Sequence, residues 1–481
     1  MILGLFWVFA TVSIWLPIRI VVYGLFVSIS FGTLAVVPLE FSGGVTFVPA
    51  TILSAIVIVR LVLTARSVSA VVDAMLNWRH LGLLIAFLGY SLLLTTAAPR
   101  LFAGVPTMGL NVQQLTPLAP SVGNITQSLY LTNSCLMTLA IFLLVSDEKG
   151  QHLFRKALII GGTAAVLSGV ADMATHGSTL LDPLRTATYA LLTNADMAGA
   201  RRVVGLQPEA SAFGYATLAF GTMIVLMRPA ETLGRGWRWL AVMAGWSCLA
   251  MAALSTSSGA IIGLVFFLLV LSFDTAVVVV RGKGGADDGR RRGNLTALIA
   301  LTLGAGLAMT VLPSVGTHIA GIFDSAVLRK SSTESFEERL YWNTVSLQGL
   351  AATGGFGLGV GSTRASSWFV ALASGTGVIG SVLLAVFVLN ALLQPIRNAG
   401  SADRLLVGGA KRALLVIMLP FAGSATSVDF GLLLAFVFAV LTGIPAASAQ
   451  IPQTSAKPPV SMRRRLAFTP ARRHAHRPSD G

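Results

Sequence analysis

Apolar residues follow one another in long runs along nearly the whole chain, and shorter polar segments separate the runs. A helix rises 1.5 Å per residue, so about 20 apolar residues are needed to cross the hydrocarbon core of a bilayer. The pattern predicts about 12 to 13 membrane-spanning helices, depending on whether the short first run spans separately. The predicted spans are residues 2–16, 20–38, 46–64, 80–97, 124–146, 156–175, 209–228, 237–254, 259–280, 294–313, 367–390, 411–426 and 428–446.

The composition supports this pattern. Of the 481 residues, 54% are hydrophobic and 11% are charged, and the mean hydropathy is +0.79. Soluble domains carry about 25% charged residues, so a water-facing globule is excluded. No basic segment precedes the first apolar run, and further spans follow it, so we expect a membrane helix there and not a cleaved signal peptide. The sequence predicts an all-α polytopic membrane protein.

Side chains that commonly bind metals are few. Both cysteines, Cys135 and Cys248, lie inside apolar runs, so neither a disulfide framework nor a thiolate metal site is expected. The six histidines do not show the spacing of HExxH or a comparable ligand motif. We therefore predict no metal and no cofactor.

Basic residues are concentrated on one side of the predicted membrane. If the spans after the first alternate in direction, 25 of the 34 lysines and arginines fall in the loops and tail of one side. The positive-inside rule assigns this side, with the C-terminus, to the cytoplasm. Residues 1–446 then form one polytopic domain, and residues 447–481 form a basic, disordered tail that contacts anionic lipid. The tail lacks interleaved aromatic residues, so nucleic acid is not an expected partner.

Two long loops on the other side, 174–208 and 314–366, carry basic residues against this bias. Loops of this length are commonly functional or disordered, and these contain enough aromatic and aliphatic residues to be ordered. They are the predicted location of a functional site.

The second loop contains a predicted helix at about 335–351. Ser335 and Glu338 have the spacing of a capping box. Apolar positions at helical intervals share one face, and polar positions three or four residues apart share another. The apolar face holds Phe336, Leu340 and Leu347, and the polar stripe holds Arg339, Asn343 and Ser346. We expect this helix to lie at the membrane surface.

A glycine-rich stretch, GGFGLGVGSTRASS at 354–367, follows this helix. It matches neither GxGxxG nor GxxxxGKS/T, and no strand precedes it, so it is not a dinucleotide-binding or P-loop fingerprint. Its backbone N–H groups and hydroxyls, with Arg364 at the start of the next span, would suit a phosphate. The alternative is a plain membrane-entry turn with an interfacial arginine.

The first loop ends in a similar way. Arg201 and Arg202 precede Pro208-Glu209, which opens the seventh span. A carboxylate stabilises a helix N-terminus, so Glu209 has a purely structural interpretation. Alternatively, the arginines of both loops clamp one bridging diphosphate and stabilise the charge that develops on a leaving group.

Together these features resemble the O-antigen polymerase and ligase superfamily, and within it the Wzy-type polymerases of bacterial exopolysaccharide. The motifs are Arg-x-x-Gly-x-x-x-Glu-Ala-Ser at 202–211, the run from Glu338-Arg339 to Trp342, and Gly-x-Gly-x-Gly-x-x-Arg at 357–364. The hydropathy pattern is similar over nearly the whole chain. The motif similarity covers only residues 200–211, 255–259 and 331–381.

This resemblance implies a GT-C-like, metal-independent glycosyltransferase of the bacterial inner membrane. A growing glycan is held on polyprenyl diphosphate, and a hydroxyl of the next lipid-linked oligosaccharide attacks its anomeric carbon on the periplasmic face. Family arginines that bind the diphosphate correspond to Arg202 and Arg339, with Arg201 and Arg364 as neighbours. For the base that accepts the hydroxyl proton we expect Glu209, and Glu338 after it. A chain-length regulator and export machinery are expected partners.

Two positions depart from the family pattern. Ligases carry a histidine just before the span that follows the second loop, where this chain has Ser366-Ser367-Trp368, so a polymerase is favoured over an O-antigen ligase. Many members carry an arginine after the eighth span, where this chain has Ser255-Thr256-Ser257-Ser258-Gly259. These hydroxyls are either donors to the substrate or residues of a tight turn.

A transporter or flippase for a lipid-linked sugar is the main alternative from another class. Such proteins carry internal repeats and charges near the membrane midplane. This chain shows no convincing repeat, and few charges fall within its apolar runs: Arg60, Asp172, Asp274 and Asp429. A non-enzymatic scaffold would leave the exported arginines without a role.

Overall fold

The structure is a computed structural model that describes residues 2–38, 41, 46–65, 68–109, 114–175, 178–187, 196–197, 200–281, 293, 334–396 and 399–449. These residues form fourteen α-helices and two short hairpins. The predicted span at 294–313, the second loop up to residue 333 and the tail from residue 450 lie outside the described residues.

Nine helices of the described residues are long and apolar enough to cross a membrane. They are α6 (Gly82–Leu101), α7 (Val122–Val145), α8 (Glu148–Ala174), α9 (Ala210–Met227), α10 (Arg235–Leu254), α11 (Ser258–Arg281), α15 (Trp368–Leu393), α16 (Ser401–Ser424) and α17 (Gly431–Ala449). The predicted all-α polytopic membrane fold is confirmed.

The N-terminal region differs from the prediction. Helices α1 (Ile2–Val12) and α2 (Ile18–Ser28) have 11 residues each, which is about half of what a span needs. The predicted span 20–38 is wrong because the helix stops at Ser28. Beyond it, Thr33 bonds to the first loop and not to a helix: its N–H and its hydroxyl both donate to the Leu206 carbonyl at 3.1 Å. Helices α4 (Pro49–Leu63) and α5 (Val68–Leu76) form a bent pair that makes at most one further span.

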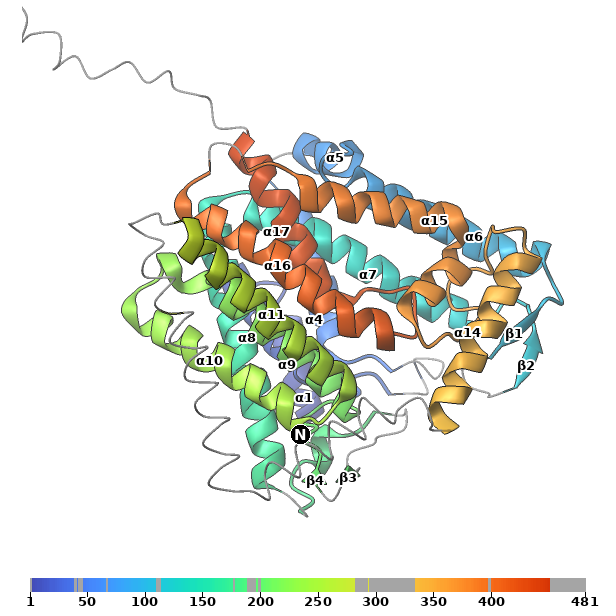
Figure 1. Cartoon of the computed structure of the whole chain (residues 1–481), viewed down its shortest axis with the longest axis horizontal. Coiled ribbons are helices and arrows are strands. Elements are labelled where there is room, and N and C mark those ends of the chain that lie inside the picture. The colour runs from blue at the N-terminus through green and yellow to red at the C-terminus, as the bar shows by residue number, and fades with distance from the viewer. Residues whose placement is uncertain are drawn as a thin grey trace, which may run out of the picture.

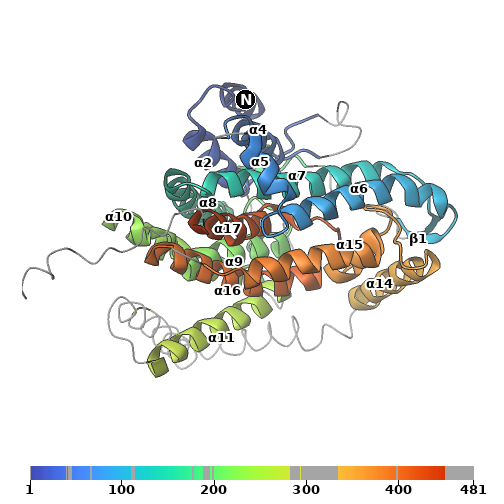
Figure 2. The same cartoon turned by 90° about the horizontal axis from the view of Figure 1, so that it is seen from above.

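Helix α17 is the centre of the bundle. Its residues from Leu433 to Ala446 are all buried, and it packs against α7 and α16. Figure 2 shows α2 and α4 on one side of this helix and α11 on the other. Phe436 of α17 stacks on Phe26 of α2 with ring centroids 4.4 Å apart. The last of the described helices is therefore the innermost of them, although in sequence it resembles any other apolar run.

Two ends of this bundle can be distinguished. Helices α9, α11, α15 and α17 begin, and α8, α10 and α16 end, at what we call the loop end (Figure 1). Helix α14 (Glu334–Ala352) and the hairpins also lie there. The hairpin strands are β1 (Pro106–Met108), β2 (Leu115–Pro117), β3 (Asp196–Met197) and β4 (Ala200–Arg201). We call the opposite end, where α17 finishes, the tail end.

Charged side chains inside the bundle join helices to one another. Asp274 of α11, for which the sequence offers no partner, forms an ion pair with Arg412 of α16. Arg60 of α4 donates to the Ser13 and Leu16 carbonyls at 2.7 and 2.5 Å. These groups have structural partners, which weakens the case for them as sites of ion or substrate transport.

Candidate functional site

The polar stripe of α14 holds the turn that carries Arg364. The helix confirms the one predicted at 335–351. Asn343 Oδ1 accepts the Ser366 N–H at 2.8 Å, and the Ser346 hydroxyl donates to the Arg364 carbonyl at 3.0 Å. From the other side, the Arg364 N–H donates to the Met108 carbonyl of β1 at 3.0 Å. The backbone of Arg364 is thus fixed between α14 and the first hairpin.

The Arg364 side chain lies against α14. Its guanidinium is 3.9 Å from the centroid of the Trp342 ring, and Trp342 is buried with Met108 and Val345. Burial lowers the pKa of Arg364, the Glu338 carboxylate raises it, and the positive charge of Arg339 lowers it further. The structure therefore brings together three predicted site residues, Glu338, Arg339 and Arg364.

This cluster carries more positive than negative charge. It contains two guanidinium groups and one carboxylate. Within the part of the chain that the structure describes, no protein acceptor takes a hydrogen bond from either guanidinium. Two like charges held close together with their donors unused form a site to which an anion would bind.

The apolar face of α14 points outward. Phe336, Leu340 and Leu347 are 39%, 56% and 46% exposed. A helix whose polar stripe faces the protein and whose apolar face is open suits contact with lipid, as its predicted place at the membrane surface requires.

The middle of the glycine-rich stretch, residues 357–360, is buried and does not form an open phosphate-binding loop. Five of its glycines, from Gly354 to Gly361, have φ between +63° and +96°, and helix α15 is broken at Gly377 to receive them. The Leu358 N–H donates to Ser374 O at 2.7 Å, and the Val360 N–H donates to Thr95 Oγ1 at 2.9 Å. Because these N–H groups bond within the protein, the hypothesis that they cradle a phosphate is wrong for them. The stretch positions Arg364.

The first loop forms a second polar cluster. Glu209 is the N-cap residue of α9 and accepts a hydrogen bond from the Ser211 hydroxyl. Arg202 is half-buried, and its Nε donates to the Ser255 carbonyl at 3.3 Å. Burial lowers the pKa of Arg202, whereas the nearby Glu209 carboxylate raises it. Arg202 and Glu209 are therefore neighbours. The backbone of Arg201 belongs to β4, but its side chain lies outside the described part.

The turn at 255–257 contacts this cluster through the Ser255 carbonyl, which accepts from Arg202. Thr256 adopts a left-handed conformation with φ of 49°, as in a tight turn. Among the described residues, its buried hydroxyl has no hydrogen-bond partner. The Val203 N–H donates to the Leu254 carbonyl at 3.2 Å and ties the loop to this turn. The left-handed Thr256 supports the interpretation of these residues as a tight turn. The Thr256 hydroxyl without a described partner supports the interpretation as a donor to the substrate.

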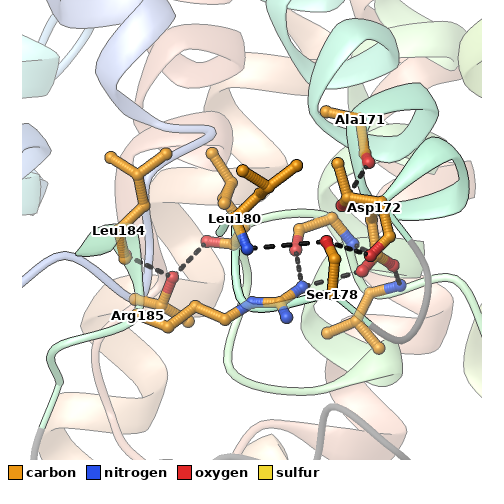
Figure 3. A network of polar contacts seen from close by, with 11 residues as sticks. Ala171, Asp172, Ser178, Leu180, Leu184 and Arg185 are labelled. Carbon is orange, nitrogen blue, oxygen red and sulfur yellow. Dashed lines mark hydrogen bonds and ion pairs between the residues drawn. The ribbon is translucent and has the colours of Figure 1, made fainter. Parts of the chain in front are cut away.

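An ion pair anchors the first loop beneath these groups. Asp172 at the end of α8 pairs with Arg185 at 2.7 Å, as Figure 3 shows. The other oxygen of Asp172 accepts the Val204 and Gly205 N–H groups at 2.9 and 3.1 Å, and Arg185 donates to the Gly205 carbonyl at 3.0 Å. Arg202 is two residues before Val204. The Asp172–Arg185 pair, by holding Val204 and Gly205, therefore helps to position Arg202.

Asp429 lies in the turn between α16 and α17. Its side chain accepts the Gly431 N–H at 3.1 Å, and the Ser134 hydroxyl of α7 and the Phe430 N–H also bond to it. Burial raises the pKa of this carboxyl to about 6, although these three bonds lower it. The sequence indicates only a charge within an apolar run. The fold adds what the sequence does not show: side chains of three helices, α7, α9 and α15, meet at this turn.

Three cavities bear on where the site lies. One of about 660 Å³ opens at the tail end, lined by Arg19, His80, Lys149, His152 and Lys156 among others. Two smaller ones of about 340 and 40 Å³ lie at the loop end beside Gly361. The larger volume is away from every predicted site residue. We place the candidate site at the loop end because the guanidinium groups of Arg339 and Arg364, whose donors have no acceptor among the described residues, are there.

Comparison with known proteins adds no relative. The chain matches no protein-family model, and no curated protein matches it. The resemblance to polymerases rests on the hydropathy pattern and the motifs of the sequence.

Proposed function

We propose that this chain is a membrane glycosyltransferase that joins oligosaccharide repeats carried on polyprenyl diphosphate. The observation that carries the proposal is the cluster of Glu338, Arg339 and Arg364 at the loop end. A diphosphate offers the charge and the acceptor oxygens that the two neighbouring guanidinium groups lack among the described residues. Stabilising it as it leaves lowers the barrier to glycosyl transfer without a metal or nucleotide.

The first-loop cluster supports the same proposal. Arg202 lies at the same end of the bundle as Arg364, half-buried, with Nε on a backbone carbonyl. It supplies a third cation for the diphosphate or its sugar. Glu209, beside it, is a candidate base for the attacking hydroxyl. The Ser211 hydroxyl that Glu209 accepts holds this carboxylate in place.

A polymerase fits the second loop better than a ligase. The ligase histidine would fall at Ser366 to Trp368. Here the Ser366 N–H is held by Asn343 and the Trp368 indole donates to the Val428 carbonyl at 3.2 Å. The Ser367 hydroxyl donates to the Ala422 carbonyl at 3.2 Å, and none of these three side chains is a base near neutral pH as an imidazole is. The acceptor in the proposal is accordingly another lipid-linked repeat.

The proposed setting is the inner membrane of a bacterium. The positive-inside rule places the tail end and the C-terminus in the cytoplasm, so the loop end faces the periplasm. The basic tail contacts anionic lipid, and a chain-length regulator and export machinery act as partners. The exposed apolar face of α14 would lie in the outer leaflet, where a polyprenyl chain could reach Arg339.

Reconstitution tests the proposal directly. The purified protein is placed in liposomes with polyprenyl-diphosphate oligosaccharide repeats, without nucleotide or metal, and the products are separated by size. We expect a ladder spaced by one repeat. Arg339→Ala should lose it, because removing a charged donor to an ionised group costs about 1.5–3 kcal/mol or more. Arg339→Lys should recover little, because the bidentate fork is absent.

Arg100 provides the matched control. It is an exposed arginine at the end of α6, also at the loop end, and its Nη1 donates to the Thr96 carbonyl. Arg100→Ala should leave the ladder unchanged. A ladder of full intensity from Arg339→Ala would remove Arg339 from the site. Substrate that crosses the bilayer without being joined would instead establish the lipid-linked sugar transporter.

A further inference from the structure

Asp429 is a carboxylate that has no basic partner in the part of the chain that the structure describes. Among the described residues, no lysine, arginine or histidine nitrogen lies within 4.0 Å of it. Its hydrogen bonds come from one hydroxyl and two backbone N–H groups. Two other carboxylates of the described helices are compensated: Asp172 by Arg185, and Asp274 by Arg412. A half-buried carboxylate without a countercharge is costly, and such groups occur where function requires them.

Asp429 also lies in a turn at the loop end that touches elements of both arginine clusters. Its turn contacts α15 through the Trp368 indole, which donates to the Val428 carbonyl at 3.2 Å, and Trp368 is four residues after Arg364. Its charge also acts on Tyr215 of α9, the helix whose N-cap residue is Glu209. The structure thus joins the second loop and the first loop through this turn.

Uncharged polar groups surround it. The side chains that face it are Tyr130 and Cys135 of α7 and Tyr215 of α9. The Tyr215 hydroxyl and the Gln127 Oε1 atom are buried without a hydrogen-bond partner in the described part. Gln127 lines a cavity of about 40 Å³ with Thr363, next to Arg364, and with Ser427 and Val428, the two residues before Asp429. This volume admits a hydroxyl or a water molecule but no sugar ring.

We propose that Asp429 is the proton acceptor for the acceptor sugar in the glycosyl transfer proposed above, on which this inference rests. The acceptor O–H bond breaks and its proton goes to an Asp429 carboxylate oxygen. The acceptor oxygen bonds to the anomeric carbon, and the bond from that carbon to the diphosphate oxygen breaks. The lipid diphosphate leaves with the electron pair, beside Arg339 and Arg364.

Asp429 suits this step better than Glu209. A general base is most effective when its pKa is near the working pH, and burial raises the pKa of Asp429 to about 6. Glu209 is already engaged, with Arg202 near it and the Ser211 hydroxyl bonded to it. Its position beside a guanidinium favours binding and orientation over proton transfer.

The test compares Asp429→Asn, Asp429→Glu and Glu209→Gln in the reconstituted ladder assay from pH 5 to 9, with kcat and KM measured separately. We expect Asp429→Asn to lower kcat about 100-fold or more with KM little changed. The wild-type rate should rise with pH through about 6, where the carboxyl ionises. Asp429→Glu should keep part of the rate, and Glu209→Gln should keep the pH profile. Asp182→Asn, an exposed acid at the loop end, is the control.

Other outcomes overturn the inference separately from the function. A wild-type ladder with unchanged kcat in Asp429→Asn would refute a role for Asp429 and leave the polymerase standing. Loss of the pH-dependent limb in Glu209→Gln would assign the base to Glu209. A third outcome is that the wild type forms no ladder at any pH but moves the substrate across the bilayer, and that Asp429→Asn abolishes this movement. That outcome would refute both proposals in favour of proton-coupled transport.

Discussion

The guanidinium of Arg364 lies 3.9 Å from the centroid of the Trp342 ring, and this pair fixes where a cation stands at the loop end. The ring covers one face of the guanidinium and leaves the N–H groups along its edge available. It attracts the cation without neutralising it, as a carboxylate would. A site for an anion needs a cation that is held in place and still charged.

Replacing Trp342 should therefore raise KM for the lipid-linked repeat by more than the loss of its packing alone would. Cation–π attraction at a partly buried site is worth about 1–2 kcal/mol, or about 5- to 30-fold in affinity. We expect Trp342→Leu to raise KM for the lipid-linked repeat by about that factor, with Trp342→Phe much closer to the wild type. Equal KM values for the two variants would show that the ring acts through packing alone.

The Asp172–Arg185 pair should dominate the stability of the first loop. Removing one partner of a buried pair leaves an uncompensated charge and costs about 3–5 kcal/mol. Asp172→Asn should lower the melting temperature in detergent, and adding Arg185→Gln should cost less than the sum of the two single changes. Asp182→Asn serves as the control because Asp182 is exposed. Strict additivity in this double-mutant cycle would contradict the pairing.

The break in α15 should tolerate no side chain. At Gly377, with φ of +66°, a Cβ would lie 2.0 Å from the Phe356 carbonyl oxygen. We expect Gly377→Ala to displace the glycine-rich stretch and lose both stability and activity. Gly354→Ala is the matched control, since φ is +63° and nothing lies within 4 Å. It should cost only the left-handed strain, about 1–2 kcal/mol. Thermal unfolding of both variants distinguishes clash from strain.

The sequence predicts the long helices well because their apolar runs exceed what a bilayer needs. It fails at 20–38, where the run is equally apolar but Thr33 is bonded to the first loop. Apolar content does not reveal such a tertiary bond. The polar stripe of α14 is predictable from its helical spacing. That it would face the protein and not solvent depends on Asn343 meeting Ser366 from a different element.

The site is only partly predictable for the same reason. Arg339, Arg364 and Glu338 share one sequence segment, so their proximity follows from a helix and a turn. Asp429 gains its importance from three helices that are far apart in sequence, and no local pattern shows this. The glycines of 354–361 are predictably irregular. Their packing against the break in α15 depends on Gly377, which in sequence resembles any other glycine in an apolar run.

Asp429 should make the protein less stable as pH rises. Burial raises its folded pKa from 3.8 to about 6, so between these values the folded state binds more protons than the unfolded state. Stability from this group is therefore greatest below pH 3.8 and is lost as pH rises through about 6, by roughly 2–3 kcal/mol in total.

Asp429→Asn cannot ionise and should escape this loss. The variant should melt at a higher temperature than the wild type at pH 7.5, and the difference should shrink at pH 5, where the wild-type carboxyl is mostly protonated. Ser134→Ala provides a second comparison, because it removes a hydrogen bond to the Asp429 carboxylate. The stability that is lost when Asp429 ionises should be larger in this variant at pH 7.5 than in the wild type. A difference between Asp429→Asn and the wild type that does not vary with pH would mean that Asp429 titrates normally. A stabilised but inactive variant would indicate that this carboxylate is kept for chemistry at a cost in stability, because packing alone would favour the amide.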